Sequence, residues 1–155
     1  MIARAAELVR LLNLSPHPEG GSYKEVWRSP SHPDRRASCT LIYFLLEHPQ
    51  HSRWHQVDAD EIWTHLEGQP LELWSWVEGR APERHLLGPL EQSGARPSLV
   101  VPAGCWQAAR PVAGYALCAC TVAPAFDFQG FTLLADRPET AGQLRLEAPT
   151  LGFLI

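Results

Sequence analysis

Nine short apolar or alternating segments follow one another through this chain, and glycine, proline or aspartate separates most of them. They span residues 22–29, 38–46, 52–57, 61–67, 71–77, 83–88, 98–102, 105–109 and 115–122. Fourteen prolines and eleven glycines among 155 residues supply the breaks. Segments this short suit strands rather than helices. Many short strands at even spacing are typical of an antiparallel sandwich or barrel, so we predict an all-β fold.

One short N-terminal helix is expected before these strands, over residues 2–12, with one apolar face formed by Ile2, Ala5, Val9 and Leu12. The prolines and glycines of residues 15–21 end it. No linker or repeat divides the remainder, so we expect a single domain over residues 1–155. The helix and the loop that follows it are expected over residues 1–16, and the barrel over residues 17–135. A tail that is a short helix or an extended arm is expected over residues 136–155.

Charge and composition exclude several classes of function. The net charge of −4 argues against nucleic acid as the main partner, since phosphate binding needs a basic face. No apolar run is long enough to span a membrane, and charged residues interrupt the N-terminus, so neither a membrane partner nor export is expected. The expected location is the cytoplasm. The chain has four cysteines, Cys39, Cys105, Cys118 and Cys120, but a core of this size does not need disulfides. Cys118 and Cys120 lie in the apolar run YALCACTV and are expected to be buried and reduced.

The segment HQVDADEIWTHLEG, residues 55–68, combines a histidine and several acids with a strand-like pattern. Because side chains alternate along a strand, Glu61 is expected to share the inner face with Trp63, His65 and Glu67. Residues 58–60 are a plausible hairpin connection, which would place His55 opposite Glu61 at roughly 5 Å. The pattern predicts that His55 and Glu61 meet inside a barrel.

Two further segments add polar residues. In VVPAGCWQAA, residues 100–109, Gln107 follows a tight turn. In HPEGGSYKEVWRS, residues 17–29, alternation places Tyr23 and Glu25 on one face, with Lys24 and Arg28 on the other. A polar alternating strand is often simply half solvated, so the second segment alone is weak evidence for a site.

Together these segments resemble the two motifs of the cupin superfamily of small β-barrels, and more closely a cupin subfamily of unknown function. The matching blocks occur in the expected order between residues 17 and 131: HPEGGSYKEVWRS, IYFLL, WHQVDADEIW followed by GQPLEL, VPAGCWQAA and TVAPAFDFQGF. The resemblance implies an antiparallel jelly-roll barrel that is usually paired as a homodimer.

The resemblance also implies a metal site, which this chain has altered. Metal-binding cupins present two histidines and a glutamate from the first motif and a histidine from the second. Here His55 and Glu61 remain, but Val57 and Gln107 stand at the other two positions. Valine cannot coordinate, and an amide oxygen is a poor ligand for a transition metal. We therefore expect no tight metal and no cofactor. The alternative is a metal-dependent cupin enzyme that uses His55 and Glu61 as ligands.

Some metal-free cupins epimerise or isomerise sugars with a histidine base and a tyrosine acid. On that resemblance the partner is a small, sugar-like ligand, and the candidate catalytic residues are His55, Glu61 and Tyr23. The candidate ligand-binding residues around the same pocket are Glu25, Trp63 and Gln107. Two alternatives stay open. The protein could bind a ligand without turnover, or His55 and Glu61 could only satisfy each other inside the barrel.

A homodimer is the expected assembly. Strand edges and apolar sheet faces would be exposed in a single barrel. If the odd-numbered residues of LELWSWV face the core, the others would be partly exposed in a monomer: Glu72, Trp74 and Trp76.

Overall fold

The computed structural model describes residues 2–155 and confirms the all-β class with a short N-terminal helix, α1 (Ile2–Leu11). The side chain of Ile2, expected on the apolar face of that helix, lies outside the described residues. All nine predicted strands are present, with their ends shifted by at most a few residues. Two short strands and the C-terminal helices complete the fold.

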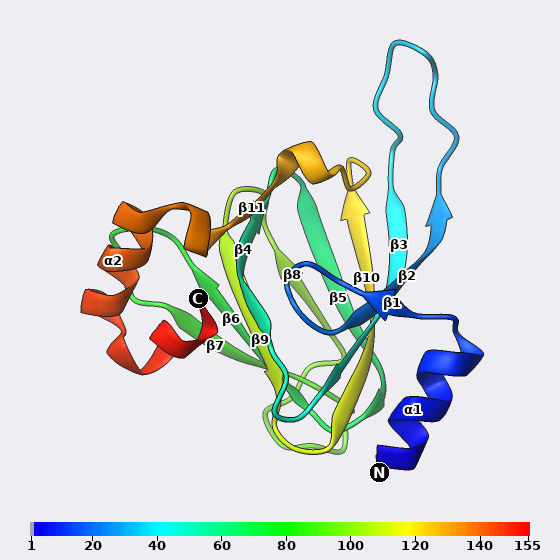
Figure 1. Ribbon diagram of the computed structural model, residues 1–155, viewed down its shortest axis with the longest axis horizontal. Coiled ribbons are helices and arrows are strands. Elements are labelled where there is room, and N and C mark those ends of the chain that lie inside the picture. Colours follow the sequence, from blue (N-terminus) through cyan, green and yellow to red (C-terminus); the bar gives the residue numbers. More distant parts are fainter. Residues whose placement is uncertain (1) are drawn as a thin grey trace.

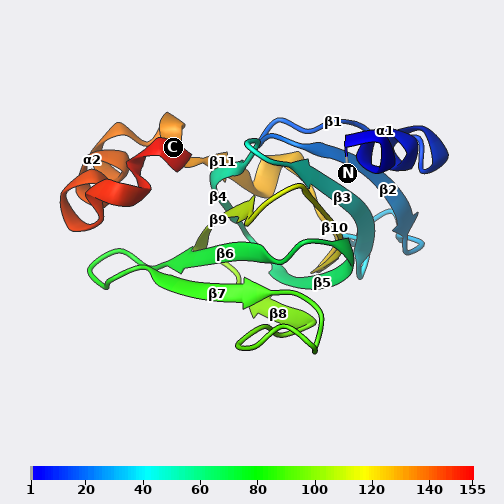
Figure 2. The same cartoon turned by 90° about the horizontal axis from the view of Figure 1, so that it is seen from below.

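Within the described residues the strands form two antiparallel sheets that face each other (Figure 1). Sheet A has the order β1 (Ser15–Pro16), β2 (Ser22–Arg28), β3 (Thr40–Glu47), β10 (Tyr115–Ala123), β5 (Asp60–Gly68), β8 (Ser98–Val101). Sheet B has the order β11 (Phe131–Leu133), β4 (Ser52–Val57), β9 (Trp106–Pro111), β6 (Leu71–Trp76), β7 (Glu83–Leu87). Figure 2 shows the two sheets enclosing the barrel interior.

The expected hairpin between β4 and β5 is wrong. Strand β4 pairs with β9 and β11, whereas β5 pairs with β8 and β10. Residues 58–60 therefore form a corner between the two sheets. His55 has Gln107 as its cross-strand neighbour. It meets Glu61 from the opposite sheet, across the barrel interior.

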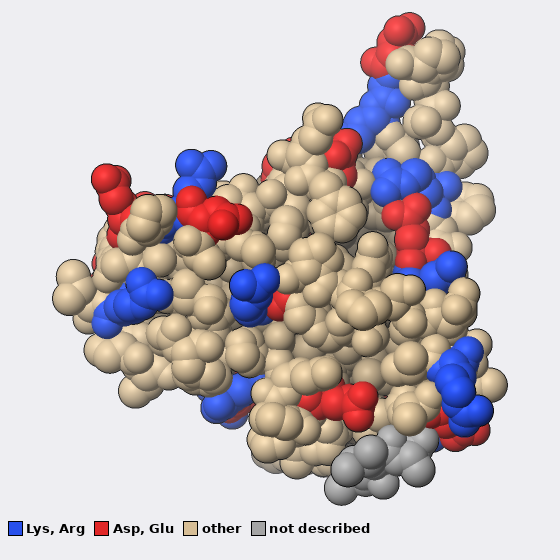
Figure 3. All heavy atoms as spheres, in the orientation of Figure 1, with Lys and Arg blue, Asp and Glu red and all other residues tan. Residues whose placement is uncertain are grey.

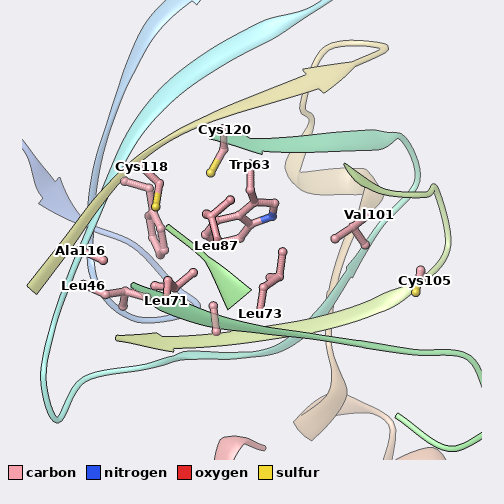
Figure 4. Packing of buried hydrophobic residues seen from close by; sticks show 12 residues of the cluster. Leu46, Trp63, Leu71, Leu73, Leu87, Val101, Cys105, Ala116, Cys118 and Cys120 are labelled. Atoms are coloured by element: carbon pink, nitrogen blue, oxygen red, sulfur yellow. The ribbon is translucent and has the colours of Figure 1, made fainter. Parts of the chain in front are cut away.

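The main core lies between the sheets. Trp63, Leu71, Leu73 and Leu87 are each at most 1% exposed, and their side chains point into the space between the strands (Figure 4). Cys118 and Cys120 lie in the same cluster. All four cysteines are free thiols, as expected, and Cys39 alone of them is only half-buried.

A second core covers the outer face of sheet B. The C-terminal tail forms α2 (Pro138–Glu147) and the 3₁₀ segment η3 (Pro149–Leu154), which pack on indoles from three strands of that sheet: Trp54, Trp76 and Trp106. Figure 1 shows this tail lying beside the sheet. Trp76 is only 1% exposed, so its expected exposure in a single chain is wrong. Trp74 is half-buried at the edge of the same cluster.

Helix α1 covers part of the outer face of sheet A, where Ala5 and Leu8 pack on Leu45 and Leu117. Glu67, expected inside the barrel, lies on this outer face because β5 has an irregularity in its register between His65 and Glu67. Its carboxylate accepts hydrogen bonds from Arg4 at 2.8 and 3.0 Å.

Charged side chains of both signs are interspersed on the face drawn in Figure 3. Over residues 2–155, helices are too short or too polar to cross a membrane.

Candidate functional site

A cavity of about 580 Å³ occupies one end of the barrel. Its lining residues come from the strand ends gathered there, such as Val57 at the end of β4 and Glu61 near the start of β5. This is the end from which the loop between β2 and β3 projects (Figure 1). Four of the six predicted site residues line the cavity: Tyr23, Glu25, His55 and Glu61.

The loop HPEGG, residues 17–21, adds two residues that sequence reasoning did not select, His17 and Glu19. Both glycines have positive φ, +113° at Gly20 and +71° at Gly21. A Cβ added at Gly20 would lie 2.2 Å from the His51 carbonyl oxygen. Only glycine fits so close an approach of two backbones. The loop can therefore turn inward and place Glu19 in the cavity.

Glu19 is the centre of a buried polar group. Its Oε1 accepts a hydrogen bond from Ser52 Oγ at 2.8 Å. Its Oε2 lies 3.2 Å from His55 Nε2 and 3.5 Å from His17 Nδ1. His55 Nδ1 lies 2.8 Å from the Arg53 carbonyl oxygen, which can only accept. This contact places a proton on Nδ1, so the neutral ring offers Nε2 as an acceptor toward Glu19.

Glu61 is held on the opposite wall of the cavity. Its Oε2 accepts a hydrogen bond of 2.6 Å from the Gln107 amide nitrogen. The Gln107 oxygen in turn accepts from Trp63 Nε1 at 2.8 Å. Gln107 and Trp63 are each 1% exposed and lie behind Glu61 rather than on the cavity surface. Their expected place on the pocket wall is therefore wrong, because both side chains are used in supporting the glutamate.

Burial makes both carboxyls weak acids. Burial raises the pKa of Glu19 to about 8 and that of Glu61 to about 7, and the hydrogen bonds from Ser52 and Gln107 oppose these shifts only in part. Burial also lowers the pKa of His55, against the pull of the Glu61 charge, and lowers that of His17 to about 4. At neutral pH the pair of Glu19 and His55 is therefore neutral, with the proton on the Glu19 carboxyl. Glu61 is then partly ionised, because its pKa lies close to neutral pH.

A register irregularity in β2 changes the rim of the cavity. The shift between Glu25 and Trp27 brings Arg28 to the side of Glu25, so their expected placement on opposite faces is wrong. Arg28 donates two hydrogen bonds of 2.9 Å to the Glu25 carboxylate. A third bond, of 3.0 Å, reaches the Phe126 carbonyl oxygen. The two side chains neutralise each other at the mouth.

Aromatic rings supply the apolar walls. Tyr23 meets His17 edge-on, with ring centroids 4.5 Å apart. Phe126 and Phe128, from the segment after β10, line the cavity and contact each other at 4.9 Å. Phe128 is 50% exposed, so its ring faces the solvent at the mouth. The aromatic surface for a ligand is thus supplied by these rings and not by Trp63.

The donor set does not fit a transition metal. Val57 forms part of the cavity wall, and both polar atoms of Gln107 are hydrogen-bonded to Glu61 and Trp63. In the part of the chain that the structure describes, no group of three or more His, Cys, Asp or Glu side chains is arranged to hold a metal ion.

A pattern could have identified Glu19. Glu19 is followed directly by two glycines, which mark a turn, and it lies next to the segment predicted to line the mouth. Strand alternation gave no information on it because loop residues have no fixed face.

The comparisons with known proteins show the family and the fold of this chain. The profile of the family described as "Cupin superfamily (DUF985)" matches residues 6–134. A hypothetical protein from Leishmania major is 30% identical, with coverage of 97% of this chain and 96% of that one and a TM-score of 0.82. Protein SO0799 from Shewanella oneidensis is also 30% identical, with coverage of 97% and 93% and a TM-score of 0.84.

More distant structures share the fold alone. Oxalate decarboxylase from Bacillus subtilis is 12% identical, with a TM-score of 0.62 over 79% of this chain and 30% of that one. No curated protein matches the chain.

Proposed function

This chain belongs to the family described as "Cupin superfamily (DUF985)", and from its cavity we propose that it binds a small sugar-like molecule and isomerises or epimerises it without a metal. The proposal rests on one observation: titratable groups face each other from opposite walls of the cavity. Glu61 faces it from sheet A, and the pair of Glu19 and His55 faces it from the other side.

Proton transfer next to a carbonyl needs a base and an acid whose pKa values lie near the working pH. The pKa of Glu61, about 7, suits a base that takes a proton from the carbon beside a carbonyl group. The pKa of Glu19, about 8, suits an acid that gives its proton to the carbonyl oxygen. The product of these two transfers is an enediol. For isomerisation, Glu61 returns its proton to the former carbonyl carbon while the hydroxyl on the neighbouring carbon gives its proton to Glu19. For epimerisation, a second acid, for which Tyr23 is the candidate, gives a proton to the other face of the same carbon while the first oxygen returns its proton to Glu19, and exchange with solvent restores the two acids.

The other candidate residues have supporting roles in this scheme. His55 holds Glu19 through Nε2 and can take up its proton. Gln107 donates to Glu61 and favours its ionised form. Tyr23 lines the same cavity and is a second candidate acid. Glu25, beside Arg28 at the mouth, is a candidate for contacts with ligand hydroxyl groups.

The lining of the cavity supports a sugar-like ligand. Its floor offers hydrogen-bond donors and acceptors, yet burial suppresses the charges of the two carboxyls. Its walls include Tyr23, Phe44 and Phe128, whose faces suit the apolar side of a sugar ring. A polar, uncharged molecule with a carbonyl group fits both properties.

Deuterium exchange tests the proposal directly. Protein treated with a chelator is incubated in D₂O with a panel of aldoses, ketoses and their phosphates, and ¹H NMR follows loss of the proton next to the carbonyl. We expect exchange with at least one member of the panel, and we expect Glu61→Gln to lower its rate by about 10²–10⁴-fold.

The outcomes separate the alternatives. A ligand that binds with unchanged affinity to Glu61→Gln but never exchanges its proton would indicate a binding module. Exchange that disappears on chelation and returns with added metal would support the metal-dependent enzyme instead. Serine at Cys39, which does not line the cavity, is the control and should leave the rate unchanged.

We further infer that the protein works as a homodimer in the cytoplasm. Free cysteines support a reducing compartment. Support for the dimer comes from the outer face of sheet A, where Trp27, Ile62 and Val100 are 53%, 40% and 61% exposed.

A further inference from the structure

Three segments that are distant in the sequence meet at the mouth of the cavity. The first is the projecting β2–β3 loop, residues 29–39. The second is the corner between β4 and β5, residues 58–60, which follows His55 and precedes Glu61. The third is the mouth segment, residues 124–130, which carries Phe126 and Phe128. Figure 1 shows the projecting loop and the start of the mouth segment at the same end of the barrel.

One side chain, Arg36 of the projecting loop, binds both of the other segments. Its Nη1 and Nη2 donate to the two carboxylate oxygens of Asp58 at 3.0 and 2.8 Å. Its Nε donates to the Ala125 carbonyl oxygen at 2.7 Å. Asp58 in turn donates its backbone N–H to the Gly130 carbonyl oxygen at 3.1 Å. Arg36 thus joins the β4–β5 corner to the mouth segment.

Other bonds hold the mouth segment at its start and at its end. Ala125 N–H donates to the Ala37 carbonyl oxygen at 3.0 Å, and Phe126 N–H donates to Thr40 Oγ1 at 2.9 Å. Arg28 donates to the Phe126 carbonyl oxygen. At the end of the segment, the Gly130 carbonyl oxygen accepts from Asp58 N–H, and β11, which follows directly, pairs with β4 from Phe131 opposite Val57. Asp58 also fits closely against Gly130. A Cβ added at Gly130 would lie 2.2 Å from Asp58 Oδ1.

We propose that Arg36 is a positioning residue that fixes the cavity mouth, and that its fork to Asp58 and Ala125 sets how readily molecules reach the site. A planar guanidinium can bond a carboxylate and a carbonyl oxygen at once, which a lysine ammonium cannot do in the same geometry. Loss of this fork releases the start of the mouth segment and the projecting loop from the corner that lies between His55 and Glu61, while the backbone bond from Asp58 to Gly130 remains. The cavity then opens more often, and the ring of Phe128 loses its fixed place against a ligand.

Two cysteines of β10 provide a test that needs no substrate. Cys120 lines the cavity, whereas Cys118 lies in the same core cluster but does not line it. Both are 1% exposed. Methylmercury chloride binds thiols, and mass spectrometry of the fragments distinguishes the two positions. Labelling of Cys120 alone reports opening of the mouth, and labelling of both reports global unfolding.

We expect Arg36→Gln to label Cys120 about three- to tenfold faster than the wild type, with Cys118 unchanged. Asp58→Asn should have a similar effect, and the double variant should be no faster than Arg36→Gln, because Arg36→Gln already breaks the bonds that Asp58→Asn removes. Asp58→Glu, which keeps the carboxylate, should label Cys120 more slowly than Asp58→Asn.

The matched control is Arg4→Gln. Arg4 also forms a two-bond pair with a carboxylate, Glu67, at 2.8 and 3.0 Å, but it lies on α1 and does not line the cavity. It should leave the Cys120 rate unchanged. An unchanged Cys120 rate in Arg36→Gln, an equal rise at Cys118, or an equal effect of Arg4→Gln would overturn the proposal. None of these results bears on the proposed chemistry, since no turnover is measured.

Discussion

The chemistry of the site depends on a few residues that are buried with their polar groups paired. Glu19 and Glu61 are each 6% exposed, and neither lies in an ion pair with an arginine or a lysine. Desolvation therefore dominates their pKa values, and the hydrogen bonds that they accept only reduce its effect. Burial thus turns two ordinary acids into groups that titrate near neutral pH.

The same shifts predict how stability depends on pH. The pKa of Glu19 is about 8 in the folded protein against an ordinary value of 4.5, so the folded state holds the proton more tightly. This contribution is fully present below pH 4.5 and is lost as the pH rises through about 8. Glu19→Gln should therefore raise Tm at pH 8.5 relative to the wild type and have little effect at pH 4.5.

Each tenfold change in the ionisation constant corresponds to about 1.4 kcal/mol, or about 3 °C in Tm for a chain of this size. Thermal melts at pH 4.5 and 8.5 measure the difference. Glu139→Gln, on the exposed first turn of α2, is the control. Equal Tm differences for Glu19→Gln at the two pH values would show that Glu19 ionises normally in the fold.

At this scale the sequence allowed only part of the site to be predicted. His55, Glu61, Tyr23 and Glu25 line the cavity, and they stand at positions that the cupin resemblance or strand alternation selected. Glu19 and His17 could not be found from alternation, because they lie in a loop whose path depends on two glycines. Gln107 was correctly associated with Glu61, but its contact with Trp63 turns it away from the cavity.

At the scale of elements, strand positions followed from the sequence, whereas the direction of some side chains did not. Alternating apolar residues and turn residues predicted all nine long strands. Single register shifts in β2 and β5 then reversed the expected faces of Arg28 and Glu67. One unpaired residue is enough to invert every later side chain in a strand, and no local pattern reveals it.

The HPEGG loop provides an element-scale prediction. Gly20→Ala should destabilise the fold by about 1–3 kcal/mol, because the residue has φ +113° and the new Cβ would meet the His51 carbonyl oxygen. Displacement of Glu19 should accompany this loss and lower any ligand affinity. Chemical denaturation measures the first effect.

Gly79→Ala is the control that separates the steric clash at Gly20 from the cost of its backbone conformation. Gly79 also has positive φ, +81°, but a Cβ added there meets nothing within 4 Å. It should cost about 1–2 kcal/mol from backbone conformation alone. If both substitutions cost the same, the close approach at Gly20 is not what determines the path of the loop.

For the whole molecule, the sequence indicated the barrel but not how its outer faces are covered. The C-terminal tail buries Trp54, Trp76 and Trp106 on sheet B, a contact between residues far apart in the chain that short-range patterns cannot predict. Sheet A is covered by α1 only in part. Its remaining outer face carries one continuous row across five strands, in which each residue pairs with the next: Trp27, Leu41, Thr121, Ile62 and Val100.

We expect this row to be the contact between two copies of the chain. Light scattering should give a mass about twice 17.3 kDa for the wild type at micromolar concentration. Ile62→Lys combined with Val100→Lys should give a monomer, because two desolvated charges at an interface cost more than a small dimer contact supplies. Leu146→Lys, at an 84% exposed position on α2, should remain dimeric. A wild-type monomer would contradict this assignment.

Titration of the glutamate carboxyls by ¹³C NMR tests the acid–base site most directly. With selectively labelled glutamate, we predict that two carboxyl signals titrate near pH 7 and pH 8, well above the rest, and that Glu61→Gln and Glu19→Gln each remove one of them. If every carboxyl signal instead titrates near its ordinary value of 4.5, the cavity holds two ionised acids at neutral pH, and Glu19 has no proton to give in the proposed transfer.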